Sequence, residues 1–221
     1  MIQSVIKGSN AHLIRTIRPL YIPDGALVLD TTYGRGGFWT EYRPRHMTIM
    51  DAKFGDDFRR LPAQWTDTYD VVVFDPPYVC KGGRATSGIQ EMDDRYGLVD
   101  APATPAEMRK LHADGLVECE RVLNVGGTLL VKMGDYISSG HYQSGLNHLT
   151  FVTTMLGLEQ VDLFIHYTHP GPQPKGRRQV HGRRAHTYLV VYRKLRPRVV
   201  AAHPQSVVLQ SESEQLTKGE Q

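Results

Sequence analysis

The amino-acid sequence predicts an α/β fold in which helices pack on a sheet of mostly parallel strands. Short apolar runs rich in β-branched residues alternate along the chain with segments of helical character. One of these runs, Val71–Phe74, is apolar at every position, as expected for a strand buried on both faces. The length of 221 residues suits one large domain better than two.

The composition is that of an ordinary globular protein, with 40% hydrophobic and 22% charged residues. The segment Met1–Asn10 lacks the apolar core of a secretory signal, and no apolar run approaches the roughly 20 residues that span a bilayer. The two cysteines, Cys80 and Cys119, form no Cys-x-x-Cys pair, which disfavours a disulfide framework and a cysteine-based zinc site. We therefore expect a cytoplasmic protein with neither a membrane segment nor a metal.

In the first half of the chain, the pattern predicts one helix and three strands. The helix is expected at Ala11–Pro19, and the strands at Ala26–Leu29, Met47–Met50 and Val71–Phe74.

In the second half, the clearest signal is a helix start at Thr104. Thr104 can cap the helix, Pro105 suits its first turn, and Glu107 completes a capping box. This helix should run to about Val122, and the glycine pair 126–127 should then turn the chain into a strand. The remaining expected elements are a strand, a helix and two strands, at Thr128–Met133, Tyr142–Leu156, Val161–Tyr167 and Thr187–Tyr192.

Two segments, Val79–Ala103 and the Pro/Gly/Arg-rich His169–His186, have no clear periodicity. Loops of this length inside a compact domain are usually functional or disordered. After Pro197 the composition turns polar. We therefore expect one domain over residues 1–196 and a disordered tail over residues 197–221.

Positive charge is concentrated near the C-terminal end. The formal net charge is +3, yet the stretch from Leu163 to Ser211 holds nine Lys and Arg and no acid, which leaves −6 for the rest. This asymmetry indicates a surface that faces a polyanion, although a merely solvated basic loop is the alternative. The residues expected to make that contact are Lys175, Arg177, Arg178, Arg183 and Arg184.

A glycine-rich turn follows the first predicted strand. In a sheet of this kind ligands bind at the carboxyl ends of the strands, and glycines let the backbone approach a ligand closely. The turn is not the dinucleotide fingerprint, because Trp39 occupies the place of the third glycine, and it lacks the Gly-Lys-Ser/Thr of a P-loop. The residues expected at a cofactor site here are Asp30, Thr31, Gly34 and Gly36.

Acidic residues after the second strand extend this site. Asp51 is placed to accept hydrogen bonds from both hydroxyls of a ribose. Asp56 or Asp57, with Phe58, begins the next connection, where an adenine ring could be held, and we assign Asp57 and Phe58 to it. A strand-end turn and a plain helix cap are the alternatives for these aspartates.

The most specific signal is Asp75-Pro76-Pro77-Tyr78, at the end of the most apolar strand. A bare turn rarely needs two consecutive prolines, since each removes a backbone donor. The segment resembles the Asp-Pro-Pro-Tyr signature of amino-directed methyltransferases. Together with the upstream Asp30-x-x-x-Gly34-x-Gly36, it makes the chain similar to that family over roughly residues 10–195.

The resemblance implies a Rossmann-like class I methyltransferase fold, with a mostly parallel seven-stranded sheet and an antiparallel last strand. It also implies S-adenosylmethionine as cofactor, and Asp75, Pro76, Pro77 and Tyr78 as the catalytic segment. An exocyclic base amine is a poor nucleophile because its lone pair is delocalised into the ring. The Asp75 carboxylate and the Pro76 carbonyl can accept its hydrogen bonds, while Tyr78 can stack on a flipped-out base. No metal is required.

In this family an aspartate at the first position is associated mainly with adenine N6 in DNA, which makes DNA the expected partner. Cytosine N4 and RNA bases stay open, as does a non-catalytic nucleic-acid-binding module, which would not need the carboxylate. A nicotinamide oxidoreductase is disfavoured by Trp39. Lys132, near the end of the predicted strand Thr128–Met133, is equally consistent with a substrate contact and with a stem that reaches solvent.

Sequence-specific DNA methyltransferases commonly carry a separate recognition domain, whereas this chain offers only Val79–Ala103 and His169–His186 for that purpose. We therefore expect a short or loosely read recognition sequence, or one that a partner supplies. The segment Arg177–Tyr188 is more loosely similar to small methylases of bacteriophages and their bacterial hosts. The expected location is therefore the bacterial cytoplasm or nucleoid.

Overall fold

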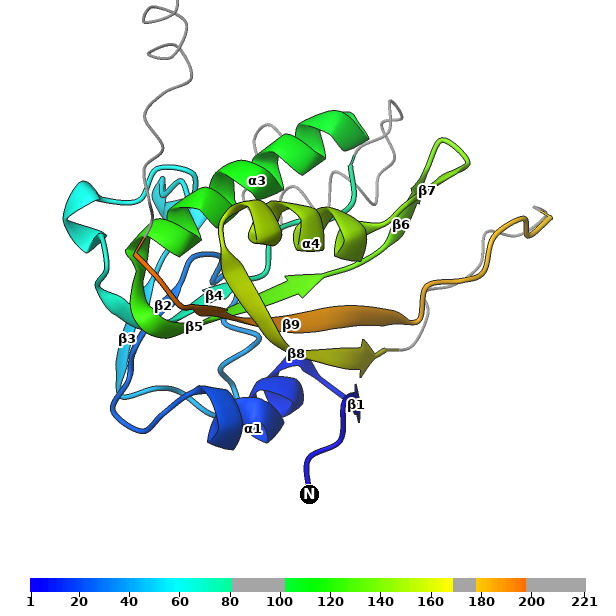
Figure 1. Ribbon diagram of the computed structural model, residues 1–221. Helices are drawn as coiled ribbons and strands as arrows, with labels where there is room; N and C mark the ends of the chain where they lie inside the picture. Colours follow the sequence, from blue (N-terminus) through cyan, green and yellow to red (C-terminus); the bar gives the residue numbers. More distant parts are fainter. Residues whose placement is uncertain (81–101, 169–177, 198–221) are drawn as a thin grey trace, which may run out of the picture.

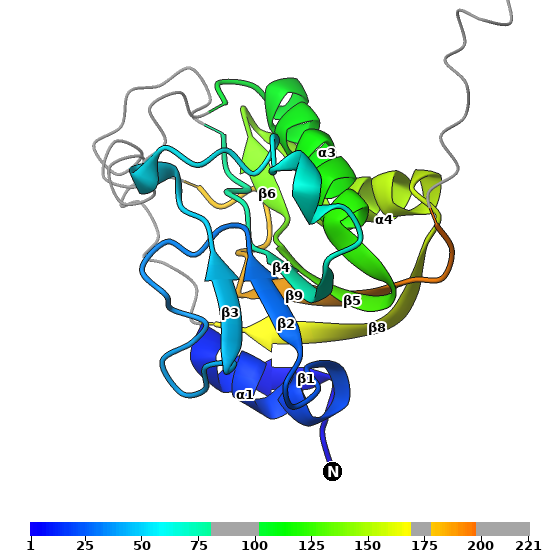
Figure 2. The same ribbon diagram turned by 90° about the vertical axis from the view of Figure 1, so that its left-hand side faces the viewer.

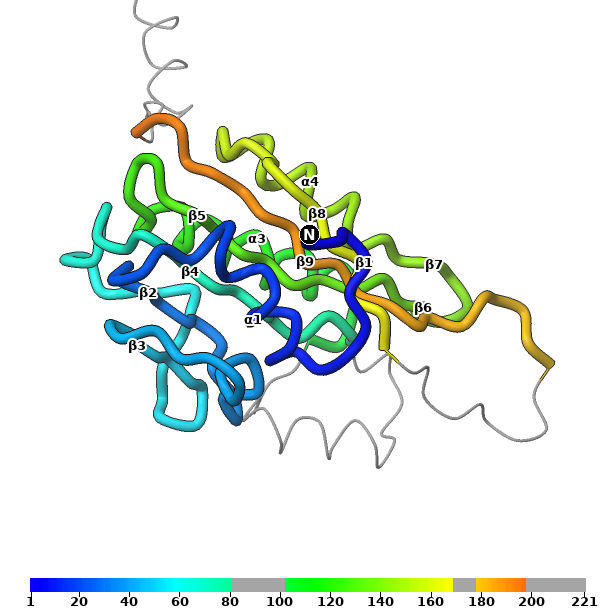
Figure 3. Tube along the Cα trace, turned by 90° about the horizontal axis from the view of Figure 1, so that it is seen from below, coloured from blue at the N-terminus to red at the C-terminus, as the bar shows by residue number. Residues whose placement is uncertain are grey.

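The computed structural model describes residues 1–80, 102–168 and 178–197. A seven-stranded sheet forms the middle layer, with α3 and α4 on one face and α1 on the other (Figures 1 and 2). Figure 3 shows the face that α1 covers. The helices are α1 (Asn10–Tyr21), α3 (Pro105–Val122) and α4 (Gly145–Met155), and two short 3-10 turns are η1 (Ala52–Phe54) and η2 (Ala63–Trp65).

The strand order in the sheet is β1-β8-β9-β5-β4-β2-β3. All neighbouring pairs are parallel except those of β9, which runs antiparallel to both β5 and β8. The prediction of a mostly parallel seven-stranded sheet with an antiparallel last strand is therefore confirmed. The strands are β1 (Val5–Lys7), β2 (Leu27–Asp30), β3 (His46–Ile49), β4 (Tyr69–Phe74), β5 (Leu123–Met133), β8 (Leu158–Tyr167) and β9 (His186–Lys194).

Side chains alternate along the central strands and build one apolar core on each face. In β4, Val72 and Phe74 point to the α3/α4 face, whereas Val71 and Val73 pack with α1. All four are fully buried, which explains why this run is apolar at every position. Burial on both faces fixes the end of β4, and with it the start of the Asp-Pro-Pro-Tyr segment.

The helix start at Thr104 is as predicted. The Thr104 hydroxyl accepts a hydrogen bond from the Glu107 backbone, and the Glu107 carboxylate accepts one from the Thr104 backbone in return. This helix, α3, ends at Val122 as expected. Strand β5 begins directly at Leu123, earlier than predicted, but residues 124–127 leave the ladder, with Gly126 at a φ of 82°, and regular pairing with β4 resumes at Thr128.

Two further elements differ from the sequence prediction. The short strand β1 is new, because three residues at a sheet edge leave no periodic signal. The expected helix Tyr142–Leu156 starts only at Gly145, and the residues before it form a hairpin of β6 (Tyr136–Ser138) and β7 (His141–Gln143). Ser139 and Gly140 both have positive φ, as a two-residue hairpin turn requires.

Within the described residues, no helix combines the length and apolar character needed to cross a membrane. The same residues contain no group of three or more His, Cys, Asp or Glu side chains placed to hold a metal ion. Most of the expected tail, from residue 198 onward, lies outside the described residues, as do most of Val79–Ala103 and the start of His169–His186.

Candidate active site

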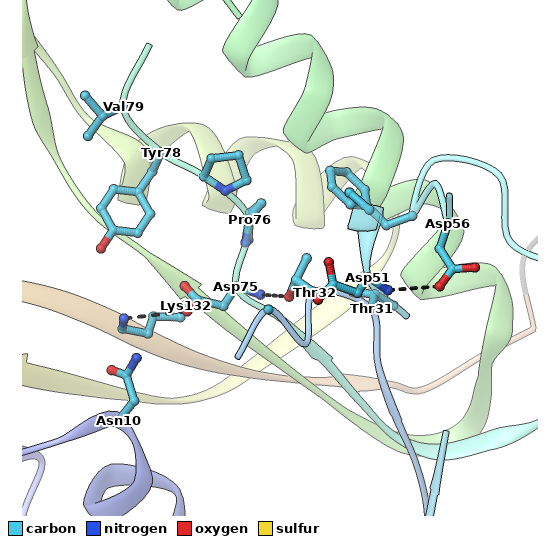
Figure 4. A pocket seen from close by; sticks show the side chains of 14 residues that line it. Asn10, Thr31, Thr32, Asp51, Asp56, Asp75, Pro76, Tyr78, Val79 and Lys132 are labelled. Atoms are coloured by element: carbon cyan, nitrogen blue, oxygen red, sulfur yellow. Dashed lines mark hydrogen bonds and ion pairs between the residues drawn. The ribbon is translucent and has the colours of Figure 1, made fainter. Parts of the chain in front are cut away.

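A cavity opens at the carboxyl ends of the parallel strands. It encloses about 840 Å³ of empty space, part of it open to solvent. Figure 4 shows its lining, with Asp75 between a group around Asp51 and a group around Tyr78. Eight of the predicted site residues line it: Thr31, Gly34, Asp51, Phe58, Asp75, Pro76, Pro77 and Tyr78.

The Asp-Pro-Pro-Tyr segment is held from two sides. On the strand side, the Asp75 backbone N–H donates to the Thr32 hydroxyl oxygen at 2.7 Å. On the helix side, Nε2 of His112 lies 2.6 Å from the carbonyl oxygen of Pro77. Because a carbonyl only accepts, His112 is the donor. The prolines have no N–H, so these two bonds replace the backbone ladder in fixing the segment.

His112 comes from α3 and is almost fully buried. Burial lowers its pKa to about 4, against the opposing effect of the hydrogen bond to Pro77. The imidazole is therefore neutral at physiological pH, with its proton on Nε2. No pattern in the sequence indicated this role, since a histidine inside a helix is most often solvated or packed.

A glycine that follows β5 makes room for Tyr78. A Cβ added to Gly134 would lie 2.8 Å from Cε2 of Tyr78, closer than real contacts allow. The Tyr78 ring therefore packs directly on the backbone that follows β5 and forms one wall of the cavity. A ring fixed in this way offers a flat face on which a base can stack.

The other half of the cavity carries the residues predicted for a cofactor. Asp51 is 5% exposed, and one of its oxygens accepts the backbone N–H of Lys53 at 2.9 Å. Its own backbone N–H donates to Asp56. Phe58 packs edge-on against Phe74, with ring centroids 5.2 Å apart, and lines the cavity. The same cavity is thus lined by an acidic acceptor and an apolar ring, which suit the sugar and the base of a nucleoside.

Three predicted cofactor residues do not line this cavity. Asp30 lies behind the glycine turn, where it accepts hydrogen bonds from the Thr32 backbone and the Trp39 indole. Gly36 packs directly on Tyr33: a Cβ added to Gly36 would lie only 2.5 Å from the tyrosine hydroxyl, which leaves no room for a side chain. Asp57 turns away to pair with Arg59, and its neighbour Asp56 takes the place at the cavity. Asp30 and Gly36 thus shape the turn from behind.

Asn10, Thr32 and Lys132 line the cavity although the sequence prediction did not assign them to the site. Asn10 begins α1 and arrives from the opposite face of the sheet, so only the tertiary fold brings it here. Thr32 belongs to the predicted turn but was passed over in favour of Thr31. For Lys132, the structure supports neither a purely solvent-directed stem nor a free surface cation, because the residue is 6% exposed.

A second hollow continues beneath the glycine turn. It shares Asn10, Thr32, Gly34 and Asp75 with the first cavity and is further lined by Asp30, Tyr33, Arg35, Gly37 and Phe38. Asp75 therefore lies where two hollows meet. Such a position lets one carboxylate face two ligands that must be brought together.

The carboxylates at this edge influence one another. Burial is the main cause that raises the pKa of Asp30 to about 7; the charges of Asp75 and Asp51 contribute to the rise, and the bonds from Trp39 and Thr32 oppose it. Burial also raises the pKa of Asp75, while Lys132 counteracts the rise. The site thus gathers negative charge in a place of low solvation, as catalytic sites often do.

The predicted basic loop lies beside the β6–β7 hairpin. Arg178 and Arg183 are exposed, whereas Arg184 is half-buried over the ring of Tyr142, 5.1 Å from its centroid. A hydrogen bond of 2.9 Å joins His181 to the Gly140 carbonyl at the hairpin turn. Lys175 and Arg177 lie outside the described residues. The described part, residues 178–185, contains no helix or strand, as expected for a loop.

No family model matches the sequence, and a search among curated proteins finds no match. Solved structures that are similar to this chain include TTHA0409 of Thermus thermophilus, provisionally named a DNA modification methylase, in complex with S-adenosylmethionine. That pair has a TM-score of 0.40 and 15% identity over 81% of this chain and 60% of TTHA0409. Without the ligand, the match to TTHA0409 covers 68% of this chain and 56% of that one, at a TM-score of 0.41 and 17% identity. The chain thus spans less than two thirds of TTHA0409.

The N-methyltransferase NodS of Bradyrhizobium japonicum is also similar, with a TM-score of 0.48 and 12% identity over 85% of this chain and 94% of NodS. Similarities of this size do not decide an activity, so the function must be argued from the site.

Proposed function

We propose that this protein is an S-adenosylmethionine-dependent methyltransferase that methylates an exocyclic amine of a nucleic-acid base, with adenine N6 in DNA as the first candidate. The observation that carries the proposal is the position of Asp75-Pro76-Pro77-Tyr78, at the junction of two hollows and opposite Asp51 and Phe58. One part of the hollow suits a nucleoside cofactor, and the other presents acceptors and an aromatic wall to a second ligand.

The residues of the chain fit the cofactor. The second carboxylate oxygen of Asp51 has no hydrogen-bond partner among the described residues, so it can accept the ribose hydroxyls. Phe58 offers an apolar face for the adenine ring, and Gly34, with φ of 57°, brings backbone rather than side chain to the cavity wall. S-adenosylmethionine supplies, when bound, a methyl group activated by its positively charged sulfur.

The chain contributes to the reaction by holding the amine. The Asp75 carboxylate accepts one N–H of the base amine, and the Pro76 carbonyl accepts the other. Both bonds draw the nitrogen toward tetrahedral geometry and localise its lone pair for in-line attack. Tyr78 fixes the plane of the base, and Asp75 stabilises the positive charge that develops on the nitrogen.

The exposed Arg178 and Arg183, on the loop beside the hairpin, support a polyanionic substrate. An aspartate at the first motif position favours adenine over cytosine, as the family resemblance implies. A protein of the bacterial cytoplasm or nucleoid would meet such a substrate.

The test is incubation of the purified protein with unmethylated DNA and methyl-labelled S-adenosylmethionine, followed by nucleoside mass spectrometry. We expect label in N6-methyladenine, and Asp75→Ala should abolish it while leaving the calorimetric affinity for the cofactor nearly intact. Asp51→Ala should weaken cofactor binding by about 1.5–3 kcal/mol, the scale of a charge-assisted hydrogen bond. Label in N4-methylcytosine or only in RNA would correct the substrate, and full turnover of Asp75→Ala would remove the mechanism.

A further inference from the structure

Lys132 is a buried cation with few partners. It lies near the end of β5, and its side chain is 7% exposed. Its Nζ is 3.7 Å from Oδ2 of Asp75 and 5.7 Å from the centroid of the Phe38 ring. These are its only contacts with a carboxylate or an aromatic ring within the described part of the chain. An ammonium carries three donors, so its burial is costly unless the one carboxylate it faces is kept charged.

The ion pair with Lys132 leaves one carboxylate oxygen of Asp75 available to a ligand. Its side chain is 25% exposed, and at 3.7 Å the lysine is an ion-pair partner rather than a short hydrogen bond. Only Oδ2 has a charged partner among the described residues, which leaves Oδ1 for a ligand in either hollow.

Asp75 needs this partner because burial disfavours its charge. Asp30 and Asp51 are not among the groups that shift the pKa of Asp75, whereas the charge of Asp75 raises the pKa of Asp30. Burial lowers the pKa of His166 from β8, and the charge of Lys132 lowers it too, against the hydrogen bond to the Gly8 carbonyl. The remaining titratable groups that line the hollows or contact the segment are Tyr33, Arg35, Asp56, Tyr78 and His112.

Asp75 must be ionised to accept a hydrogen bond from an amine through either of its carboxylate oxygens. A carboxylate accepts hydrogen bonds through both oxygens, whereas a carboxylic acid presents an O–H that would oppose an amine donor. Burial raises the pKa of Asp75, and the charge of Lys132 lowers it. Arg35 is not among the groups that shift it.

We propose that Lys132 is a positioning residue that keeps Asp75 ionised, so that the carboxylate can accept the hydrogen bond of the target amine. The role of the amine rests on the proposed function, whereas the coupling between Lys132 and Asp75 does not. Lys132 thereby ties the end of β5 to the end of β4 within the reaction site.

The experiment measures the titration of Asp75 by carbon-13 NMR of aspartate-labelled protein, with the Asp75 resonance assigned from Asp75→Asn. In Lys132→Met the midpoint should move up by about one pH unit, the lower end of the effect expected for loss of an opposite charge at this distance. Lys132→Arg keeps the charge and should stay close to wild type. Lys110→Met, which removes an exposed lysine of α3, is the matched control and should change nothing.

An Asp75 midpoint that is the same in Lys132→Met and in wild type would overturn the proposal. Should Lys132→Met not fold, the wild-type protein decides. The Lys132 Cε resonance, assigned from Lys132→Arg, must then shift at the same midpoint as Asp75, and its failure to do so would overturn the proposal equally.

The pH dependence of methylation provides a second test of the coupling between Lys132 and Asp75. The acidic limb of kcat for DNA methylation should move to higher pH in Lys132→Met and return in Lys132→Arg, whereas a merely structural lysine would lower kcat at every pH alike. If the NMR coupling is found but no DNA is methylated, the proposed function fails and the pairing of Lys132 with Asp75 stands.

Discussion

Two lysines are buried at opposite ends of the sheet, and their surroundings differ. Lys194, at the end of β9, donates to Asp67 and to the carbonyls of Glu120 and Leu123, at 2.8–2.9 Å, and pairs with the Glu120 carboxylate at 3.2 Å. Lys132, at the end of β5, has one carboxylate at 3.7 Å and an aromatic ring. One ammonium is saturated with acceptors, whereas the other faces a cavity.

The difference separates a structural end of the sheet from a reactive one. At the amino ends of the parallel strands, Lys194 joins α3, β5 and the turn before β4, so its bonds hold the fold together. At the carboxyl ends, carboxylates gather in a poorly solvated place, where Lys132 and Asp75 form the one ion pair between two described residues that line the cavity. Polar groups left partly unsatisfied in a cavity are available to a ligand. We therefore expect changes at the first end to affect stability, and changes at the second to affect catalysis.

The largest effect should come from Lys194→Met. It leaves the Glu120 carboxylate, which is 1% exposed, without its cation. Removal of one partner of a buried pair typically costs about 3–5 kcal/mol of unfolding free energy. Lys132→Met should lower the unfolding free energy by less, because the Asp75 side chain that it leaves behind is in contact with solvent. Urea denaturation of both variants measures this, and a larger loss for Lys132→Met would contradict the distinction between the two ends.

The reactive end should also make stability depend on pH. The pKa of Asp30 is about 7 in the folded protein, above the ordinary value of 3.8 expected when unfolded. The folded state therefore binds this proton more tightly. The resulting stabilisation is complete below about pH 3.8 and is lost as the pH rises through 7.

The expected loss is on the order of 4 kcal/mol at most. Asp30→Asn removes the titrating group, so its unfolding free energy should fall less between pH 4.5 and 7.5 than that of wild type. The exposed Asp24, changed to Asn, is the matched control and should leave the wild-type slope. Equal slopes for wild type and Asp30→Asn would mean that the carboxylate at position 30 is solvated.

A smaller effect is expected from Gly134→Ala, which tests whether the wall formed by Tyr78 serves catalysis. The new methyl group would lie 2.8 Å from the Tyr78 ring and must displace it. We expect kcat to fall about tenfold, while overpacking costs about 1 kcal/mol of stability. Cofactor affinity should be unchanged, because Asp51 lies in the other half of the cavity, away from Tyr78 (Figure 4). Turnover near that of wild type would show that Tyr78 can move without consequence.

The sequence predicted the parts of this site that are local. Asp75–Tyr78, Thr31, Gly34 and Asp51 follow strand ends, and a strand that is apolar on both faces marks its own end. The glycine turn was recognised as a whole, but which of its residues face the cavity depends on backbone torsions that the pattern does not encode. Gly36 and Asp57 were therefore assigned to the cavity although they face elsewhere.

Contacts between distant segments could not be predicted. His112 meets Pro77 across 35 positions, and Asn10 comes from a helix on the far face. In the sequence, Lys132 and Lys194 are both simply lysines near the end of a strand. Only their neighbours in three dimensions show that the Lys194 ammonium is saturated with acceptors and that the Lys132 ammonium is not. The hairpin β6–β7 was missed because a helical pattern begins nearby and because two three-residue strands leave no period of their own.

The smallest effect concerns the basic loop, and it extends the comparison to the surface beside the reactive end. Arg178 and Arg183 are exposed, whereas Arg184 packs on Tyr142 of the hairpin and so has a structural neighbour. Removal of one phosphate-binding cation should reduce the slope of log affinity against log salt by about 0.9 for duplex DNA. Arg178→Ala with Arg183→Ala should therefore flatten that slope by up to roughly 1.8, and Arg184→Ala should change it less. Cofactor affinity should stay unchanged, because none of the three lines the cavity.

The measurement is a salt titration of DNA affinity for wild type and both variants. If the double variant gives a line that coincides with wild type, Arg178 and Arg183 are merely solvated, and the DNA must approach the reactive end from another side.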